Sequence, residues 1–217
     1  NNSARLGKSD WSILESDESD GSFINIHPTY SIITNVDREH MDYYKSMESL
    51  KRLFSNFIEK VPSFGKSFIC IDNKNNNEII KKIKIKNYYT YGTSINSQFR
   101  IRNIEQSKEF SKFNVDIKLP GKKDLTIKNI IIPLLGLHNI RNATAAIAVA
   151  TTLGISKEII KNGLKGFKGV QRRFNKIFTY RETVFFDDYA HHPTEIKEVL
   201  SGVRHVYKKE EIICVFQ

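Results

Sequence analysis

A glycine-flanked, alanine-rich segment places the strongest constraint on what this chain can fold into. It spans residues 136–154, and its apolar residues recur at offsets of three and four: Ile140, Ala143, Ile147 and Ala150. This spacing predicts a single helix, and alanine is the strongest helix former. Because its side chains are small, we expect the helix to pack closely against a sheet.

The first turn of this predicted helix is polar. Asn139 and Asn142 lie one turn apart on the same face, beside His138 and Arg141. Two interpretations are open. The amide side chains cap the helix and satisfy the loop backbone, or the free N–H groups and positive dipole of the helix N-terminus face an anionic ligand.

The segments before this helix predict an α/β fold with a mostly parallel sheet flanked by helices. Strands are expected at residues 11–14, 31–34, 67–71 and 88–91, and helices at residues 46–60 and 76–82. Alternating polar and apolar residues then predict an inserted antiparallel meander, with strands at 99–104, 113–119 and 125–132 and a hairpin turn at 120–123.

After the central helix, Ser156 is predicted to cap a second helix, with Ile159, Ile160 and Leu164 facing inward. A strand at residues 183–186 and a helix from Pro193 follow. We expect a domain boundary near residues 175–180. Residues 1–178 would form the central domain and residues 179–217 the beginning of a second α/β domain.

Both ends of the sequence suggest an internal fragment. The chain opens in a polar loop without Met, and residues 212–216 predict a buried strand with nothing to pack on. Cys70 and Cys214 lie in apolar runs without metal or redox spacing, and we expect both to be buried thiols in a reducing cytoplasm. There is no apolar run of about 18 residues and no export signal, which argues against a membrane protein.

Polar clusters follow three of the predicted strands, where ligands of α/β proteins usually bind. Glu18 lies in an acidic turn after residues 11–14, and His40 follows residues 31–34. Acids and histidines at residues 187–195 follow the strand at 183–186. Each cluster alone fits a solvated turn or a helix cap, but Glu18 and His40 together favour a divalent metal site.

Charge and arginine placement leave alternatives open. The net charge of +10 fits a nucleic-acid binder, a solvated lysine-rich surface or a phosphate-rich small substrate. The lysine run at residues 81–86 lacks the aromatic residues of a base-stacking surface, so we favour no nucleic-acid partner. Arg172 and Arg173 in a glycine-flanked loop suit a phosphate or carboxylate, although exposed arginines are common.

Five motifs, taken in order, resemble the Mur ligase family. They are ESDESDGSF at 15–23, TNVDREHMD at 34–42, GLHNIRNA at 136–143, GVQRRF at 169–174 and DDYAHHPTE at 187–195. The resemblance covers nearly the whole chain. It implies a bacterial cytoplasmic enzyme of peptidoglycan precursor synthesis, with the central ATPase domain and the start of the amino-acid-binding domain present.

The resemblance also implies a reaction and a set of site residues. ATP phosphorylates a sugar-linked carboxylate, and the amine of an amino acid attacks the acyl phosphate; UDP-N-acetylmuramate and L-alanine are the expected substrates. Motif matching assigns residues as follows: Glu18 and His40 to Mg²⁺, Asn139 and Asn142 to ATP, Arg173 with Arg172 to phosphate, Asp188 to the nucleotide ribose, and His191 to the nucleotide or substrate region. His191 and Arg173 are the expected catalytic residues. The oligomeric state is not predicted.

Two departures from the family pattern bear on activity. The family's phosphate loop is expected upstream of residue 1, and most of the last domain is expected after residue 217, so the chain alone is predicted to lack turnover. The alternatives are a related ligase that recycles a muropeptide or extends a glutamate chain, and a non-catalytic nucleic-acid binder.

Overall fold

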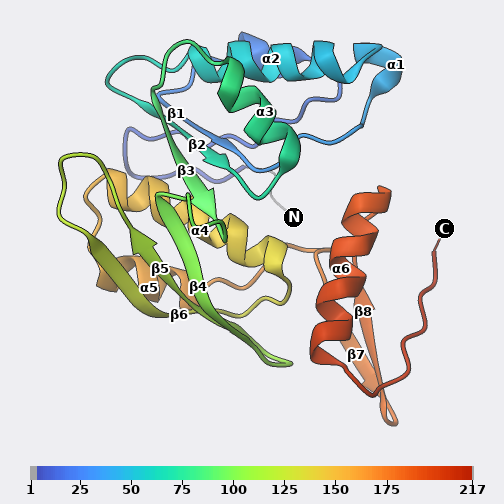
Figure 1. Cartoon of the computed structure of the whole chain (residues 1–217). Helices are drawn as coiled ribbons and strands as arrows, with labels where there is room; N and C mark the ends of the chain where they lie inside the picture. Colours follow the sequence, from blue (N-terminus) through green and yellow to red (C-terminus); the bar gives the residue numbers. More distant parts are fainter. Residues whose placement is uncertain (1–3, 217) are drawn as a thin grey trace.

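The computed structural model describes residues 4–216 and contains a six-stranded sheet and a separate strand pair (Figure 1). The six strands follow each other in chain order across the sheet, and they are β1 (Tyr30–Ile33), β2 (Lys66–Cys70), β3 (Tyr88–Gly92), β4 (Phe99–Gln106), β5 (Ser111–Ile117) and β6 (Leu125–Ile132). Strands β1 to β4 pair in parallel, and β4 to β6 pair antiparallel. The predicted meander is therefore confirmed, and it extends the same sheet.

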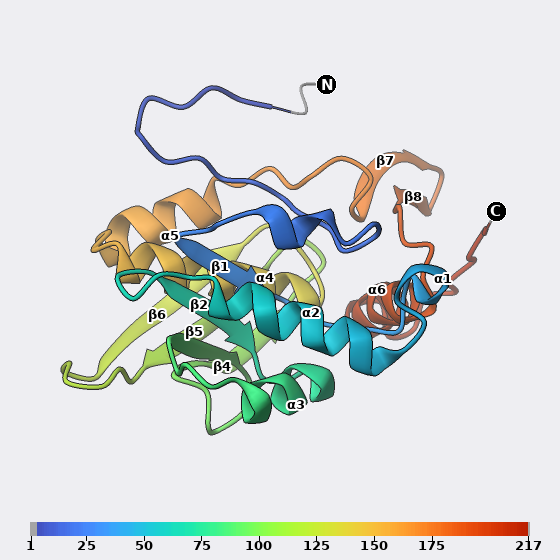
Figure 2. The ribbon, with the colours of Figure 1, turned by 90° about the horizontal axis from the view of Figure 1, so that it is seen from above.

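Helices cover both faces of this sheet (Figures 1 and 2). One face carries η1 (Ser22–Asn25), the short α1 (Met41–Tyr44), α2 (Met47–Glu59) and α3 (Lys74–Lys82), and the other carries α4 (Leu137–Thr152) and α5 (Lys157–Lys165). Each face has its own buried apolar cluster, because successive strand residues point to opposite sides. In β2, for example, Phe68 joins the cluster under α4 and Ile69 joins the cluster under α2.

The local sequence signals explain where these elements begin. Ser46 and Ser156 cap α2 and α5 by accepting hydrogen bonds from backbone N–H groups three residues on. Gly136 precedes α4 with a φ of 90°, a conformation that favours glycine. The helix predicted at 136–154 is thus confirmed, and Ile140 and Ile147 are fully buried against the sheet.

A smaller unit follows α5. Strands β7 (Asn175–Tyr180) and β8 (Thr183–Asp187) form an antiparallel pair, and α6 (Pro193–Val206) begins with a proline in its first turn. Helix α6 contacts α4 so closely that a Cβ placed on Gly202 would lie 3.0 Å from Gly136 Cα. The division expected between residues 178 and 179 falls inside β7.

Two strands predicted from short apolar runs are absent from the described chain. Residues 11–14 have no ladder partner there, and Ile13 is 97% exposed. Residues 212–216 are also irregular, and Cys214 is exposed, whereas Cys70 is buried as expected. Both predictions were wrong because an apolar run reports hydrophobicity and cannot supply the neighbouring strand that a ladder needs.

One inward-facing residue was also predicted wrongly. All three residues lie on α5. Ile160 is buried, but Ile159 is 64% exposed and Leu164 is only partly buried. Adjacent helix positions are separated by about 100° around the axis, and in α5 this turn places Ile159 on the solvent side while Ile160 faces the sheet. Within the described residues, the structure contains no helix that meets the length and hydropathy needed to cross a bilayer.

Candidate active site

Two carboxylates and an imidazole meet beyond the end of β1. One ligand atom each from Glu18, Glu39 and His40 lies within 4.8 Å of the other two. Glu18 comes from the loop before η1, and His40 precedes α1 with a left-handed φ of 53°. Burial, helped by the neighbouring Glu39 carboxylate, raises the pKa of Glu18. A cation in this cluster would relieve that penalty.

The donor chemistry of the cluster fits a divalent cation. Carboxylate oxygens suit Mg²⁺ and Mn²⁺, and Mg²⁺ in nucleotide sites is usually held by one or two carboxylates together with phosphates. Glu18 and His40 were the residues predicted from sequence to approach one another, and they do. Glu39 was missed. The available signal was its position, since it directly precedes the predicted histidine ligand.

The polar first turn of α4 contains both bonded and exposed side chains. Asn139 donates a hydrogen bond from Nδ2 to the carbonyl oxygen of Leu135, 2.7 Å away, and Asn142 is exposed. Burial lowers the pKa of His138, and its Nδ1 has no protein partner in the described structure. Asn139 therefore bonds to the loop backbone, as the capping interpretation expects. Its side-chain oxygen can still accept a hydrogen bond from a ligand.

Arg141, on the same turn, forms an ion pair that sequence reasoning missed. Its Nε lies 2.8 Å from Asp72 Oδ2, and Asp72 also accepts hydrogen bonds from the backbone N–H groups of Thr93 and Ser94. Burial by itself would raise the pKa of Asp72, but the bonds from Thr93 and the Arg141 guanidinium hold it below its ordinary value. This pair fixes α4 to the loops that follow β2 and β3.

The paired arginines lie against the motif at residues 187–195. Arg173 Nη1 is 3.4 Å from Glu195 Oε1, and the Arg172 guanidinium lies 4.6 Å from the centre of the Tyr189 ring. The Asp188 carboxylate accepts hydrogen bonds from the backbone N–H groups of Phe174 and Ala190, both at 2.7 Å. Asp188 thus joins the two motifs that the sequence placed on either side of β7 and β8.

The smaller unit reaches the central unit at the candidate metal cluster. His192 Nδ1 lies 3.1 Å from Glu39 Oε1, and Arg141 Nη1 lies 3.9 Å from Glu198 Oε2. His191, one of the two predicted catalytic residues, has a largely exposed side chain, and its Nδ1 is 3.0 Å from the Tyr189 carbonyl oxygen. Glu39 and His192 therefore join the cluster to the 187–195 motif, and Arg141 and Glu198 join the first turn of α4 to α6.

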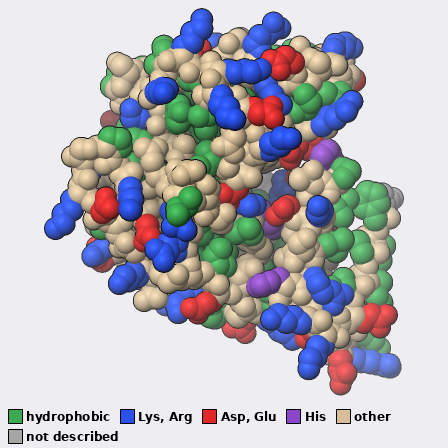
Figure 3. Space-filling view, viewed as in Figure 1, with side chains coloured by type: hydrophobic (Ala, Val, Ile, Leu, Met, Phe, Trp, Pro, Cys, Tyr) green, Lys and Arg blue, Asp and Glu red, His purple; other side chains and the backbone are tan. Residues whose placement is uncertain are grey.

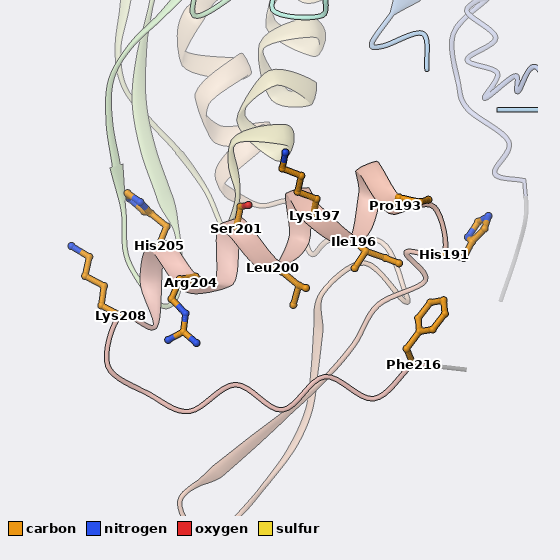
Figure 4. Close-up of a pocket in the computed structure, with 10 residues that line it drawn as sticks. All are labelled: His191, Pro193, Ile196, Lys197, Leu200, Ser201, Arg204, His205, Lys208 and Phe216. Carbon is orange, nitrogen blue, oxygen red and sulfur yellow. The ribbon is translucent and has the colours of Figure 1, made fainter. Parts of the chain in front are cut away.

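A separate groove lies on the other side of α6. It has a volume of about 1120 Å³ and runs between α6 and the segment that ends at Phe216 (Figure 4). Its lining includes Ile196, Leu200 and Phe216, together with the predicted catalytic residue His191. Glu18, His40 and Asn139 do not line it, so this groove is distinct from the candidate metal cluster.

Family comparison agrees with this arrangement. The family model described as Mur ligase middle domain matches residues 8–150, and the model described as Mur ligase, glutamate ligase domain matches residues 172–217. The chain belongs to the Mur ligase family.

Individual relatives carry a more specific name than the two family models do. The chain is 71% identical to the UDP-N-acetylmuramate--L-alanine ligase of Pelagibacter ubique (strain HTCC1062), covering 100% of this chain and 47% of the relative. It is 42% identical to the ligase of the same name from Bartonella henselae, covering 99% of this chain and 45% of that protein. The chain therefore spans about half the length of the curated relatives it matches.

Solved structures of Mur ligases also align with this chain. The crystal structure of UDP-N-acetylmuramate-alanine ligase from Thermotoga maritima aligns with a TM-score of 0.71 at 27% identity, covering 89% of this chain and 42% of that one. MurF from Acinetobacter baumannii aligns with a TM-score of 0.70 at 23% identity, covering 84% of this chain and 38% of that one. The second likeness supports the fold alone.

Proposed function

We propose that this chain is the nucleotide-handling part of an ATP-dependent ligase that joins L-alanine to UDP-N-acetylmuramate in peptidoglycan precursor synthesis. The observation that carries the proposal is the contact between the Glu18–Glu39–His40 cluster and the 187–195 motif through Glu39 and His192. It joins a cation site to arginines and histidines that suit a phosphorylated substrate. The two substrates are inferred from the names of the relatives.

The residue roles follow from this geometry and from the motif matches. Glu18 and His40, with Glu39 beside them, would hold Mg²⁺, which supplies neutralisation of phosphate charge. Asn139 and Asn142 on α4 would face ATP. On the smaller unit, Arg173 with Arg172 would contact phosphate, Asp188 the ribose, and His191 the nucleotide or substrate. Arg173 and His191 are the proposed catalytic residues.

The proposed chemistry needs no side-chain nucleophile. A carboxylate oxygen of the sugar substrate takes the terminal phosphoryl group of ATP, and ADP leaves. The amine of L-alanine then forms a bond to the acyl carbon, loses a proton and displaces inorganic phosphate. Both steps depend mainly on positioning and charge stabilisation, which prearranged cationic side chains provide.

We further propose that the boundary between the central and C-terminal units lies within residues 166–174. The support is that β7 begins at Asn175 and pairs only with β8 among the described strands. We place the reaction in the bacterial cytoplasm, because the relatives are bacterial and the proposed substrates are a nucleotide sugar and ATP.

A chimera tests the proposed reaction. The chain replaces the matching segment of the Pelagibacter ubique relative, and phosphate release is measured with UDP-N-acetylmuramate, ATP, Mg²⁺ and L-alanine. We expect alanine-dependent turnover, with the unaltered relative as the reference. Turnover with L-glutamate, or with the peptide part of a muropeptide, in place of L-alanine would favour a related ligase. A well-folded chimera without any amino-acid-dependent phosphate release would contradict the proposal.

Nucleic-acid binding is the alternative that the charge of +10 raised. On the face in Figure 3, Lys and Arg side chains are scattered over both units and interspersed with acidic ones. A salt titration against duplex and single-stranded DNA tests it, because binding to phosphate backbones weakens steeply with salt. We expect no such salt-sensitive binding.

A further inference from the structure

The loop that carries Glu18 and the segment that carries His40 are both hydrogen-bonded to one residue, Tyr44. The Tyr44 hydroxyl donates a hydrogen bond to the backbone carbonyl oxygen of Glu18. The backbone N–H of Tyr44 donates to the carbonyl oxygen of His40, 3.0 Å away. Glu18 and His40 are far apart in sequence, and Tyr44 holds the backbone of both.

Tyr44 is itself firmly held. It is 3% exposed and belongs to the apolar cluster that packs under α2. A buried donor of this kind is expensive to leave without an acceptor, which favours the conformation in which Glu18 is bonded.

The preceding residue supports the same loop. The Tyr43 ring lies 4.8 Å from the Tyr44 ring in an edge-on arrangement. A Cβ built on Gly21, which has a left-handed φ of 72°, would lie 2.5 Å from the Tyr43 hydroxyl. Gly21 also donates its N–H to the Glu18 carbonyl oxygen at 3.2 Å. The loop from Glu18 to Gly21 is thus closed on itself and packed against both tyrosines.

We propose that Tyr44 is a positioning residue of the cation site. It sets the distance between the Glu18 carboxylate and the His40 imidazole through its hydroxyl bond to the Glu18 carbonyl and its backbone N–H bond to the His40 carbonyl. Tyr44 touches no reacting atom and supplies no ligand. Residues that orient metal ligands from the next layer commonly change metal affinity by about tenfold or more. This inference rests on the proposed cation site at Glu18, Glu39 and His40.

The test measures cation affinity directly on the chain, with Mn²⁺ as the probe. Free Mn²⁺ is followed by electron paramagnetic resonance, and broadening of the His40 ring proton signals by bound Mn²⁺ is followed by NMR. For Tyr44→Phe we expect the affinity for Mn²⁺ to fall about tenfold. The change removes one oxygen atom from the ring, and folded fractions are matched by circular dichroism.

Tyr91→Phe is the matched control. Tyr91 is also fully buried and donates its hydroxyl to a backbone carbonyl, that of Ile33, but it makes no bond to Glu18 or His40. We expect it to lose stability and to bind Mn²⁺ like the unaltered chain. Equal weakening of Mn²⁺ binding by both substitutions, or none by Tyr44→Phe, would overturn the positioning role.

A second variant keeps the inference testable if Tyr44→Phe does not fold. Gly21→Ala places a methyl group against the exposed Tyr43 ring and disturbs the same loop without touching Tyr44. It should also weaken Mn²⁺ binding, and unchanged affinity would refute the inference. Glu18→Gln tests the site itself. If the unaltered chain and Glu18→Gln bind Mn²⁺ equally, the cation site fails, and the role of Tyr44 fails with it.

Discussion

The ion pair between Asp72 and Arg141 should contribute more to stability than any surface pair of this chain. The Asp72 side chain is 7% exposed and that of Arg141 is 25% exposed, so solvent screens their interaction weakly. Hydrogen bonds to charged groups are worth about 1.5–3 kcal/mol each. Asp72→Ala removes the acceptor and leaves Arg141 partly buried without its partner. We expect the free energy of unfolding to fall by about 3 kcal/mol.

Replacing the other partner should cost less. In Arg141→Met the Asp72 carboxylate keeps its bonds from the backbone N–H groups of Thr93 and Ser94 and from the Thr93 hydroxyl. We expect a loss of about 1–2 kcal/mol. The double variant should lose less than the sum of the single ones, because the two residues are in direct contact. Urea unfolding followed by circular dichroism measures all three values.

The effect of Asp72 should depend on pH in one direction. Its pKa is lower in the folded chain than its ordinary value of 3.8. The stabilisation is therefore complete above pH 3.8 and is lost as pH falls through the folded pKa. The difference in unfolding free energy between the unaltered chain and Asp72→Ala should shrink on acidification from pH 7 to pH 3.

A surface pair provides the control for this prediction. Arg102 Nη1 lies 3.1 Å from Asp116 Oδ2, with the arginine side chain half exposed. Such pairs are worth about 1 kcal/mol or less, so Asp116→Ala should have a small effect. Equal losses for Asp72→Ala and Asp116→Ala, or a pH-independent difference for Asp72→Ala, would refute the reasoning.

Three further predictions use burial and the candidate site. In the native chain Cys214 should react quickly with a thiol reagent and Cys70 slowly, as counted by mass spectrometry; two fast thiols would contradict the structure. Ile160→Ala should lower the unfolding free energy by about 2–4 kcal/mol, while Ile159→Ala, at an exposed position, should change it by about 0.5 kcal/mol or less in urea unfolding. In the chimera, Glu18→Ala should lower turnover by orders of magnitude, whereas Cys70→Ser should mainly lower the melting temperature; equal losses at matched folded fraction would contradict the proposed division of roles.

Local patterns were sufficient for most elements of the fold. The offsets of three and four in residues 136–154 predicted α4, and the alternation at residues 113–119 predicted β5, in which buried and partly buried residues alternate. Ser156 marked where α5 begins. These signals work because helix periodicity, strand alternation and capping depend on residues close in sequence.

The sequence by itself determined the order of the elements, their approximate bounds and, through five motifs, the residues to examine. Only the tertiary structure decided which of these elements find partners. Residues 11–14 are as apolar as a strand but have no neighbour to pair with in the described chain. Contacts between distant positions were equally invisible, since Arg141 and Asp72 lie 69 positions apart and Tyr44 and Glu18 lie 26 apart. Hydrogen bonds and ion pairs of this kind depend on distances that the fold sets, and no periodicity in the sequence encodes them.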